Sequence, residues 1–468
     1  MTNSASFSSN ELIAIFGEIN CNFFNDFKTS SVETDTRSMK PNSLFIAIKG
    51  EQHDSHNFIG KAIENGAVCI IVEQSWFEQN QYNFKGVNFI SVKNTTKALG
   101  KLANFHRTRF DIEVVAVAGS NGKTTTKDLI SKVLSTEKNV LKTNKNFNNQ
   151  IGVPLMLLQL DDTYDLAVIE IGTNEPGEIY LLSEILAPTA GVITNIGKEH
   201  LEGFLDLDGV ESEETSLFAY LKKSDSVAFL NMDDERLAKY LPIFDNVFTY
   251  GQNTNNEFNL NAKIEINKDL TSKLTLNNQV DTFEINLRAK GLNFAYNAIP
   301  AVAIGLFYKI PIEKIIKSLE SYEPDAGQSY GRMVILQKDG VTILNDTYNA
   351  NPNSTSLALE TLSLTQSDNK IAVLGDMLEL GENSTNEHEE ILKKAKSIAN
   401  SILVYGNNFK QSLALMDDTS NINHFENKEE LINYLQKILI SNTAILVKGS
   451  RGMQMEQVVE QILQKSSK

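Results

Sequence analysis

Cysteine is scarce in this sequence, and so are positive charge and long apolar runs. Only 2 cysteines, Cys21 and Cys69, occur in 468 residues, which argues against a disulfide framework and favours a reducing compartment. The formal net charge of −16 argues against nucleic acid or an anionic membrane as a partner. No apolar run approaches the length of a membrane span, and the N-terminus shows no signal-peptide pattern. We therefore expect a cytoplasmic protein without stable membrane association.

The chain is too long for one hydrophobic core, and its pattern divides into three regions. An apolar content of 41% and a charged content of 22% are ordinary for a globular protein. Residues 1–107 predict a small α/β unit, 108–320 a larger unit of alternating strands and helices, and 321–468 a third α/β unit after the loop at 323–328. We expect three domains.

A phosphate-binding loop is the most informative feature that the sequence does contain. An apolar, β-branched run at 113–118 predicts a buried strand, and apolar residues at helical spacing follow at 127–134. Glycines in such a turn let backbone N–H groups close on phosphate oxygens, and the helix N-terminus adds partial positive charge. A lysine would reach the terminal phosphates and a threonine hydroxyl would bind Mg²⁺. The loop residues are Gly119, Ser120, Asn121, Gly122, Lys123, Thr124 and Thr125.

Strands alternate with helices along most of the chain. We therefore predict the α/β class, with a central parallel-sheet ATPase domain flanked by an N-terminal α/β domain and a C-terminal Rossmann-like domain. A polar, alternating stretch at 256–289 predicts a β-meander inside the central domain. The other predicted elements are a helix at 9–16 and strands at 44–48, 68–72, 165–171, 191–195, 341–345, 371–375, 401–405 and 444–448.

Two strand ends beside the loop carry candidate metal ligands. Glu170 ends one predicted strand and His200 follows the next. Each has a plainer interpretation, a strand-end charge that reaches solvent and a structural histidine. Together, beside a phosphate loop, they favour a divalent cation, and triphosphate oxygens favour Mg²⁺.

Further polar residues follow other strands, where ligands of open α/β sheets gather. The turn with Asn148 and Asn149 precedes a helix, and three strand ends in the third region carry the segments 346–352, 375–381 and 447–452. Each is a weak signal alone, because Asn, Asp and Gly also favour ordinary turns.

Taken together and in this order, these segments resemble the Mur ligase family, ATP-dependent enzymes that form amide bonds in peptidoglycan precursors. The resemblance implies that Lys123, Glu170, His200 and Arg332 are catalytic, and that Thr124, Glu170 and His200 hold Mg²⁺. It also implies that Asn297 and Asp346 join the phosphate loop in binding ATP. The substrate contacts that it implies are Asp35, Thr36, Arg37, Lys49, Asn148, Asn149, Tyr348, Asn349, Asn351, Lys448 and Arg451.

The C-terminal segments most resemble the branch of the family that handles D-alanyl-D-alanine. The implied reaction joins this dipeptide to UDP-N-acetylmuramoyl-tripeptide, with ATP consumed through an acyl phosphate. The N-terminal domain would hold the UDP end and the C-terminal domain the dipeptide. We expect the enzyme to be a monomer.

Two departures from the family pattern matter. Where relatives often carry His-Asn-x-x-Asn-Ala, this chain keeps only Asn297 and Ala298. Where many relatives carry a carbamylated lysine that helps to bind metal, this chain has Glu214. Glu214 could supply a carboxylate outright as a metal ligand, or could belong with Glu211 and Glu213 to a solvated acidic helix face.

Two other functions stay open at this point. A folylpolyglutamate synthase-like ligase would share the scaffold but lack the UDP-binding first region. A non-catalytic nucleotide switch would share the phosphate loop but would leave Glu170, His200 and Arg332 without a role.

Overall fold

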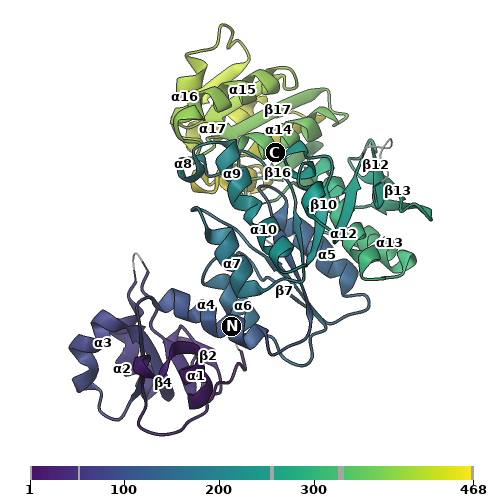
Figure 1. The fold of residues 1–468 in the computed structure, drawn as a ribbon. Helices are drawn as coiled ribbons and strands as arrows, with labels where there is room; N and C mark the ends of the chain where they lie inside the picture. Colours follow the sequence, from purple (N-terminus) through teal and green to yellow (C-terminus); the bar gives the residue numbers. More distant parts are fainter. Residues whose placement is uncertain (1–2, 51–52, 253–257, 325–330, 465–468) are drawn as a thin grey trace.

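The computed structural model describes residues 3–50, 53–252, 258–324 and 331–464. Three β-sheets follow one another along the chain, and helices pack against each of them (Figure 1). This confirms the predicted α/β class with three domains. The predicted boundaries at 107 and 320 fall at the ends of two helices and stay predictions. The loop at 323–328 and the start of the meander at 256–257 lie partly or wholly outside the described residues.

The N-terminal domain is built on a five-stranded sheet of order β1-β5-β4-β3-β2, in which β1 alone runs antiparallel to its neighbour. Alternate residues of β3 and β4 are buried on opposite faces, as expected for a sheet that is covered on both sides. Its elements are α1 (Ser9–Phe16), β1 (Cys21–Asn22), β2 (Val32–Glu33), β3 (Ser43–Ile46), α2 (Ile59–Glu64), β4 (Ala67–Glu73), α3 (Gln74–Asn80), β5 (Asn88–Val92) and α4 (Thr95–Arg107).

Helix α4 connects the first two domains and packs against both of them. It contacts α1 and β4 on one side and two helices of the central domain, α6 and α7, on the other. A Cβ added at Gly100 would lie 2.7 Å from Cδ1 of Ile185, so the glycine permits the close approach of α4 to α7. The Arg107 guanidinium donates to the backbone oxygens of Phe110 and Ile112 at the start of the central domain.

The central domain is built on a nine-stranded sheet of order β14-β13-β12-β11-β10-β9-β6-β8-β7. Strands β6 to β12 run parallel, and β12, β13 and β14 form the predicted antiparallel meander. The strands are β6 (Glu113–Ala118), β7 (Val140–Lys142), β8 (Leu166–Glu170), β9 (Ala190–Ile193), β10 (Val227–Asn231), β11 (Val247–Gly251), β12 (Leu260–Ile266), β13 (Ser272–Asn277) and β14 (Thr282–Leu287). The helices are α5 (Lys123–Leu134), α6 (Gly152–Leu157), α7 (Glu178–Leu186), α8 (Leu201–Phe204), α9 (Leu207–Glu214), α10 (Ser216–Lys223), α11 (Glu235–Ala238), α12 (Leu292–Phe307) and α13 (Ile312–Glu320).

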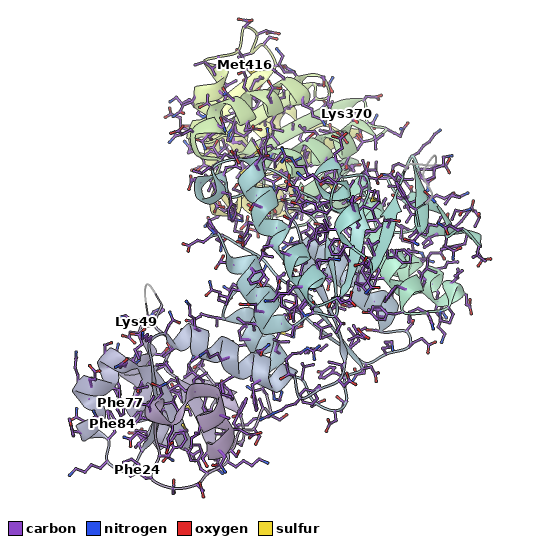
Figure 2. The ribbon with its side chains drawn as sticks, in the orientation of Figure 1. Phe24, Lys49, Phe77, Phe84, Lys370 and Met416 are labelled. Atoms are coloured by element: carbon purple, nitrogen blue, oxygen red, sulfur yellow. The ribbon has the colours of Figure 1, made fainter. Side chains whose placement is uncertain are left out.

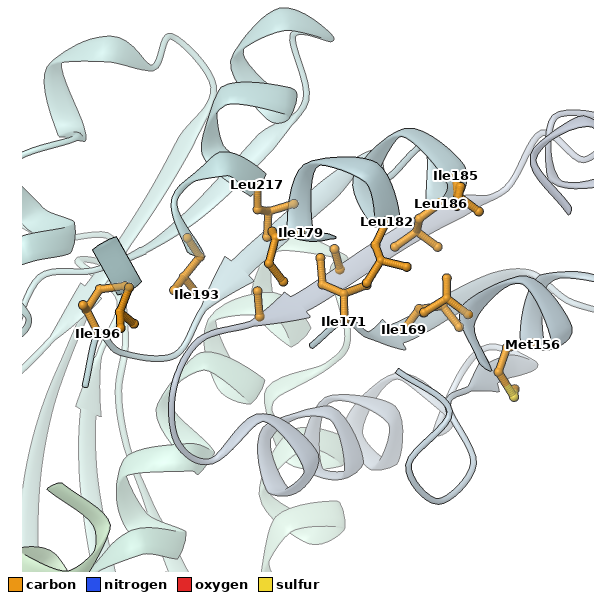
Figure 3. Packing of buried hydrophobic residues seen from close by; sticks show 14 of the residues in the cluster. Met156, Ile169, Ile171, Ile179, Leu182, Ile185, Leu186, Ile193, Ile196 and Leu217 are labelled. Carbon is orange, nitrogen blue, oxygen red and sulfur yellow. The ribbon is translucent and has the colours of Figure 1, made fainter. Parts of the chain in front are cut away.

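Two hydrophobic cores lie on the two faces of this sheet, because successive side chains of a strand point to opposite faces. Val115, Val117 and Val168 join the core under α5 and α12. The other face packs under α6, α7 and α10, and Figure 3 shows the side chains that meet there: Met156, Ile169, Ile171, Ile179, Leu182, Ile193 and Leu217.

The C-terminal domain is built on a six-stranded sheet of order β15-β16-β20-β17-β18-β19, parallel except for the edge strand β15. Edge strands β15 and β19 were not predicted from the sequence. The elements are β15 (Val334–Lys338), β16 (Val341–Asp346), α14 (Pro352–Ser363), β17 (Asn369–Gly375), α15 (Ser384–Lys396), β18 (Ser401–Tyr405), α16 (Asn407–Leu413), β19 (Ile422–Phe425), α17 (Lys428–Ile438), β20 (Thr443–Lys448) and α18 (Glu456–Gln464). Within the described ranges, none of the helices combines the length and the apolar character that a membrane crossing requires.

Candidate active site

A cleft of about 1270 Å³ lies between the central and C-terminal domains. The phosphate loop, the carboxyl ends of β8, β9 and β10 and the start of α12 form its central-domain wall. The end of β16 with α14 and α15 forms the opposite wall. Parallel strands of both sheets therefore direct their carboxyl ends to one space, as expected for ligand sites in open α/β sheets.

The phosphate loop joins β6 to α5, and two glycines permit its backbone. Gly119 has a φ of +113° and Gly122 a φ of +81°, values that side-chain-bearing residues rarely adopt. A Cβ at Gly122 would lie 2.2 Å from Oδ1 of Asn297, which therefore packs directly on the loop. Asn297 also accepts a hydrogen bond from Thr126 at 3.3 Å. The predicted contact of Asn297 with nucleotide stays a prediction, but its position beside the loop is clear.

The loop is fixed by the segment that follows β9, a feature that the sequence did not reveal. The Asn195 side chain accepts from the Asn121 backbone N–H at 3.2 Å and donates to the Asn121 carbonyl at 3.0 Å. The Ser120 hydroxyl accepts from the Gly197 N–H at 2.8 Å. Residues 74 or more positions apart make these bonds, so no local pattern could predict them. Thr124 and Thr125 are left lining the cleft.

Lys123 lies among carboxylates at the base of the cleft. Its ammonium is 3.7 Å from Glu199 and 4.0 Å from Glu214, and it donates to the Gly119 carbonyl. Burial alone would lower the pKa of Lys123, but Glu199, Glu214 and Glu170 outweigh that effect and raise it. Lys123 is therefore a fixed positive charge. Sequence reasoning passed over Glu199, although it stands directly before His200.

Glu214 lies beneath the loop and is fully buried. Its Oε2 accepts from the Gly119 N–H at 2.7 Å, and its Oε1 faces Lys123. Burial raises the pKa of Glu214 to about 8, against the opposing attraction of Lys123. The Glu214 side chain therefore holds the first glycine of the loop through Oε2.

The alternative interpretation of Glu214, a solvated acidic face on α9, is wrong. Glu211 is bound by Arg236 at 2.8 Å and by Lys239 at 2.5 Å. Glu213 accepts the Gly177 N–H at 2.6 Å and the Ile179 N–H at 2.8 Å, which satisfies the start of α7. All three carboxylates are buried, because α9 is enclosed by the helices on that face of the sheet.

Glu170 lies at the end of β8, as predicted, and is buried. Its Oε1 accepts from the Asn148 amide at 3.0 Å. Neighbouring Asn149 accepts from the N–H groups of Gly152 and Ile151 at 2.9 and 3.2 Å and so begins α6. Asn148 is therefore tied to the candidate metal ligand, whereas the Asn149 oxygen is committed to a local turn.

His200 is paired across the domain boundary. Its Nδ1 lies 2.5 Å from Oε2 of Glu379 in the C-terminal domain. Burial alone would lower the pKa of His200, but the hydrogen bond with Glu379 and the charges of Glu199 and Glu379 raise it. A metal would need the neutral ring, so binding through Nδ1 would require release of Glu379.

The donor set around the loop has the chemistry of a site for a hard cation. Within the described ranges, one oxygen each of Glu170, Glu199 and Glu214 is buried without a hydrogen-bond partner. Unpaired buried carboxylate oxygens are costly unless a cation or a proton satisfies them. No group of three or more His, Cys, Asp or Glu side chains in the described part of the chain is already gathered in ligating geometry. The residues therefore fit a cation that receives its other oxygen ligands from the molecule to which it is bound.

On the opposite wall, Arg332 stacks on Tyr348 with 3.6 Å between the guanidinium carbon and the ring centroid. Asp346 binds Lys448 at 2.6 Å, and Lys448 also donates to the Asn349 carbonyl at 2.8 Å. Lys448 is only 2% exposed. All five of these residues line the cleft, but the charge of Lys448 is already balanced.

Several residues of the C-terminal motifs have structural roles. Asp376 accepts from the N–H groups of Asn408 and Phe409 at 3.0 Å each, and so satisfies the start of α16. His388 accepts from the Met377 N–H at 2.9 Å, and burial lowers its pKa. Arg451 pairs with Glu456 at 2.9 Å and is not among the residues that line the cleft.

Residues 195–202 also bond to the C-terminal domain. The Lys198 N–H donates to Asn353 at 3.0 Å, and the Lys198 ammonium donates to Glu387 at 2.5 Å. Asn351, which begins α14, donates to Asn121 of the loop at 2.9 Å. The two walls of the cleft are therefore in direct contact through polar side chains.

The four candidates for UDP binding lie in the N-terminal domain, apart from the cleft. Asp35 accepts from the Arg37 N–H and pairs with its guanidinium at 2.6 Å, while Arg37 is 88% exposed. Thr36 follows Asp35 in a short helical turn, and its carbonyl accepts from Asn65. Figure 2 shows Lys49 at the edge of this domain, and none of the four residues lines the cleft.

Comparison with known proteins covers the whole of this architecture. Residues 28–107 match the model "Mur ligase family, catalytic domain", 117–305 "Mur ligase middle domain" and 331–451 "Mur ligase, glutamate ligase domain".

A curated relative and two solved structures are similar over almost their full lengths. The UDP-N-acetylmuramoyl-tripeptide–D-alanyl-D-alanine ligase of Bacillus subtilis is 33% identical over 446 residues, which are 92% of this chain and 93% of the relative. The structure of MurF from Acinetobacter baumannii superposes with a TM-score of 0.87 at 28% identity, covering 99% of this chain and all of that one (100%). MurF ligase from Thermotoga maritima in complex with ADP gives a TM-score of 0.80 at 26% identity, covering 93% and 97% of the two chains. The cleft, the loop and this similarity agree: the chain belongs to the Mur ligase family.

Proposed function

We propose that this protein is an ATP-dependent ligase that adds D-alanyl-D-alanine to UDP-N-acetylmuramoyl-tripeptide, forming the pentapeptide precursor, ADP and phosphate. The observation that carries the proposal is the cleft in which a phosphate loop of one domain meets the strand ends of another. The relatives at about 33% identity carry this activity in their name, and the similar structure from Thermotoga maritima contains ADP.

The chemistry requires a carboxylate to become an acyl donor. A free carboxylate repels nucleophiles and lacks a good leaving group, so the γ-phosphoryl group of ATP is transferred to it first. The amine of the dipeptide then attacks the carbonyl carbon, the new C–N bond forms, phosphate leaves and the amine loses a proton.

The residues of the loop would stabilise the transferred phosphoryl group. Lys123 keeps its charge because three carboxylates raise its pKa, and its ammonium would neutralise charge on the γ-phosphate. Backbone N–H groups of residues 119–125 would bind the other phosphates. Arg332 on the opposite wall would reach the nucleotide when the domains close on it, and Asp346 and Asn297 would lie near its nucleoside.

We propose Mg²⁺ as the partner of ATP, held by Thr124, Glu170, His200 and Glu214. The unpaired oxygens of Glu170 and Glu214 support this set. When bound, the ion would supply positive charge to the phosphate oxygens. His200 could bind the ion through Nε2 while its Nδ1 stays hydrogen-bonded to Glu379, which would orient the ring.

The remaining parts of the proposal follow the domain order. Asp35, Thr36, Arg37 and Lys49 would bind the UDP end. Asn148, Asn149, Tyr348, Asn349 and Asn351 would contact the joined substrates, as would Lys448 and Arg451 if their present partners release them. One chain supplies both walls of the cleft, which supports a monomer, and the free thiols of Cys21 and Cys69 are compatible with the cytoplasm.

Phosphate release tests the function directly. With ATP and Mg²⁺ present, we expect release only when UDP-N-acetylmuramoyl-tripeptide and D-alanyl-D-alanine are both added. Release with a folate and glutamate would instead support the folylpolyglutamate synthase-like alternative. That alternative is less favoured, because residues 28–107 form a domain that it should lack. Release that is independent of any acceptor would point to a nucleotide switch.

A further inference from the structure

We propose that α14 and α15 form the subsite for the dipeptide, with Glu387 holding its ammonium end and Lys394 its carboxylate end. This inference rests on the proposed function and locates its amino substrate. The two helices pack against each other, and both contribute polar side chains to the lining of the cleft.

The two helices share part of their spacing. The cleft residues of α14 are Pro352, Asn353, Ser354, Ser356, Leu357 and Glu360, and those of α15 are Glu387, Glu390, Ile391, Lys393 and Lys394. In each helix, four of these follow i, i+3, i+4, i+7 (from Asn353 in α14 and from Glu387 in α15), which places them on one side of the helix. The wall therefore offers an apolar residue from each helix, Leu357 and Ile391, between charged residues of both signs.

A D-alanyl-D-alanine molecule has the complementary chemistry. It carries an ammonium at one end, a carboxylate at the other and two methyl groups between. Its two residues span at most about 7 Å when extended, and a charge-assisted hydrogen bond at each end adds about 2.8 Å. Glu387 and Lys394 are seven residues apart on α15, which corresponds to about 10 Å along the helix. With both bonds the extended dipeptide spans at most about 13 Å, which is enough to bridge a separation of about 10 Å.

Two lysines of α15 line the cleft, and of these Lys393 is paired with Glu389 and Glu390 at 2.9 and 2.8 Å. We assign the carboxylate to Lys394. Lys394 donates to the Ser356 hydroxyl at 2.5 Å and to Glu360, and its side chain is 30% exposed. An ammonium has three donors, so the third can serve a substrate. Lys448 is 2% exposed and bound to Asp346, and Arg451 does not line the cleft. Neither Lys448 nor Arg451 is therefore as accessible to a carboxylate in the cleft as Lys394 is.

Glu387 lies at the end of the subsite nearest the phosphate loop. Its Oε1 accepts from Lys198, two residues before His200, and its side chain is 14% exposed. The dipeptide amine must attack a carbonyl beside the loop, so the ammonium end belongs here and the carboxylate end at Lys394. The dipeptide therefore lies along α15 with its ammonium end toward the N-terminal part of the helix, which is the part nearer the loop.

A substrate without the carboxylate separates this subsite from other roles. The probe is D-alanyl-D-alaninamide, compared with D-alanyl-D-alanine in the phosphate-release assay on the full chain. We expect the wild-type enzyme to prefer the carboxylate form by tenfold or more. Lys394→Met should lower kcat/KM for the dipeptide about tenfold or more and leave that for the amide unchanged, so that the preference disappears. The KM for ATP should not move.

Matched variants on the same helix keep the test sharp. Lys396→Met removes a lysine that binds Asp418 outside the cleft, and should retain the preference. Lys394→Arg should retain most of it, which guards against a merely misfolded Lys394→Met protein. Glu387→Gln should raise the KM for the dipeptide, whereas Glu389→Gln, also outside the cleft lining, should not.

The outcomes also separate this inference from the function on which it rests. If the wild-type enzyme is active with the dipeptide but Lys394→Met keeps the wild-type preference, the subsite is wrong and the ligase function stands. If the wild-type enzyme releases no phosphate with the dipeptide, both are overturned.

Discussion

The phosphate loop and the strand ends of the C-terminal domain each contain a buried lysine next to acidic side chains. The two lysines, Lys123 and Lys448, differ in whether they form close ion pairs with those acids. Lys448 lies 2.6 Å from Asp346 and 2.8 Å from a carbonyl. Lys123 lies 3.7 and 4.0 Å from its two carboxylates, beyond hydrogen-bond range. Buried oxygens near Lys123 are unpaired within the described residues. The close ion pair of Lys448 with Asp346 stabilises the fold. Lys123, which forms no such close pair, can bind the charge of a ligand.

The largest effect should come from Lys123. Lys123→Ala should lower turnover several hundredfold, since loss of one charge contact to the reacting group costs on the order of 3–4 kcal/mol. Stability should also fall, because the variant removes the cation that faces the buried Glu199 and Glu214 side chains. Phosphate-release kinetics and urea unfolding measure the two quantities.

Lys132→Ala, on the exposed side of the same helix, is the matched control and should leave turnover unchanged. A folded Lys123→Ala protein with near-normal turnover would remove the loop from the mechanism.

The close ion pair of Lys448 should matter mainly for stability. Lys448→Met should lower the free energy of unfolding by about 3 kcal/mol, because it leaves the Asp346 carboxylate buried and unpaired. Urea unfolding at pH 7 measures this loss. If stability holds while the KM for D-alanyl-D-alanine rises, Lys448 is a substrate contact after all, as the sequence predicted.

The smallest effect concerns Glu214. Glu214→Gln should reduce turnover about tenfold, about 1.4 kcal/mol of barrier, because glutamine can still accept from the Gly119 N–H but cannot ionise to bind a cation beside Lys123. Because a glutamate needs no carbon dioxide to become a carboxylate, wild-type turnover should not depend on bicarbonate. An unchanged Glu214→Gln enzyme would assign the residue to the fold alone.

The same variant has a pH signature. Burial raises the pKa of Glu214 to about 8 from 4.5, so the folded protein retains a proton that the unfolded chain has lost across this interval. Stability contributed by this group therefore falls as the pH rises from 4.5 to 8, by at most about 1.4 kcal/mol per pH unit. Glu214→Gln should flatten that fall in urea unfolding measured at several pH values. An unchanged slope would contradict the raised pKa.

Local pattern predicted many of the strands and a few of the helices, but not the contacts between them. The strand at 401–405 has the predicted limits, and the loop, its strand and its helix follow in the predicted order. Apolar periodicity records which face of an element is buried, so it predicts these elements well. Edge strands β15 and β19 carry half-buried or exposed side chains, which weakens that signal.

The site was predicted in its chemistry more than in its partners. Glu170 and His200 lie at the cleft as expected. The pairing of His200 with Glu379, of Asn195 with Asn121 and of Lys198 with Glu387 joins residues from distant segments. Asp376 and His388 form a motif that resembles a site in the sequence, yet they satisfy backbone groups. A strand-end polar residue can cap a helix or bind a ligand, and only the tertiary structure distinguishes the two.

Helix α4 determines whether the first two domains can be separated into independently folded fragments. Its residues Leu99, Leu102 and Ala103 are buried in a hydrophobic cluster that includes side chains of both the first and the second sheet. Cutting the chain after Arg107 would leave α4 on the N-terminal fragment with its contacts to α6 and α7 exposed to water, and would open the cover of the central sheet. The first two domains therefore stabilise each other through α4. We expect them to unfold together in one cooperative transition.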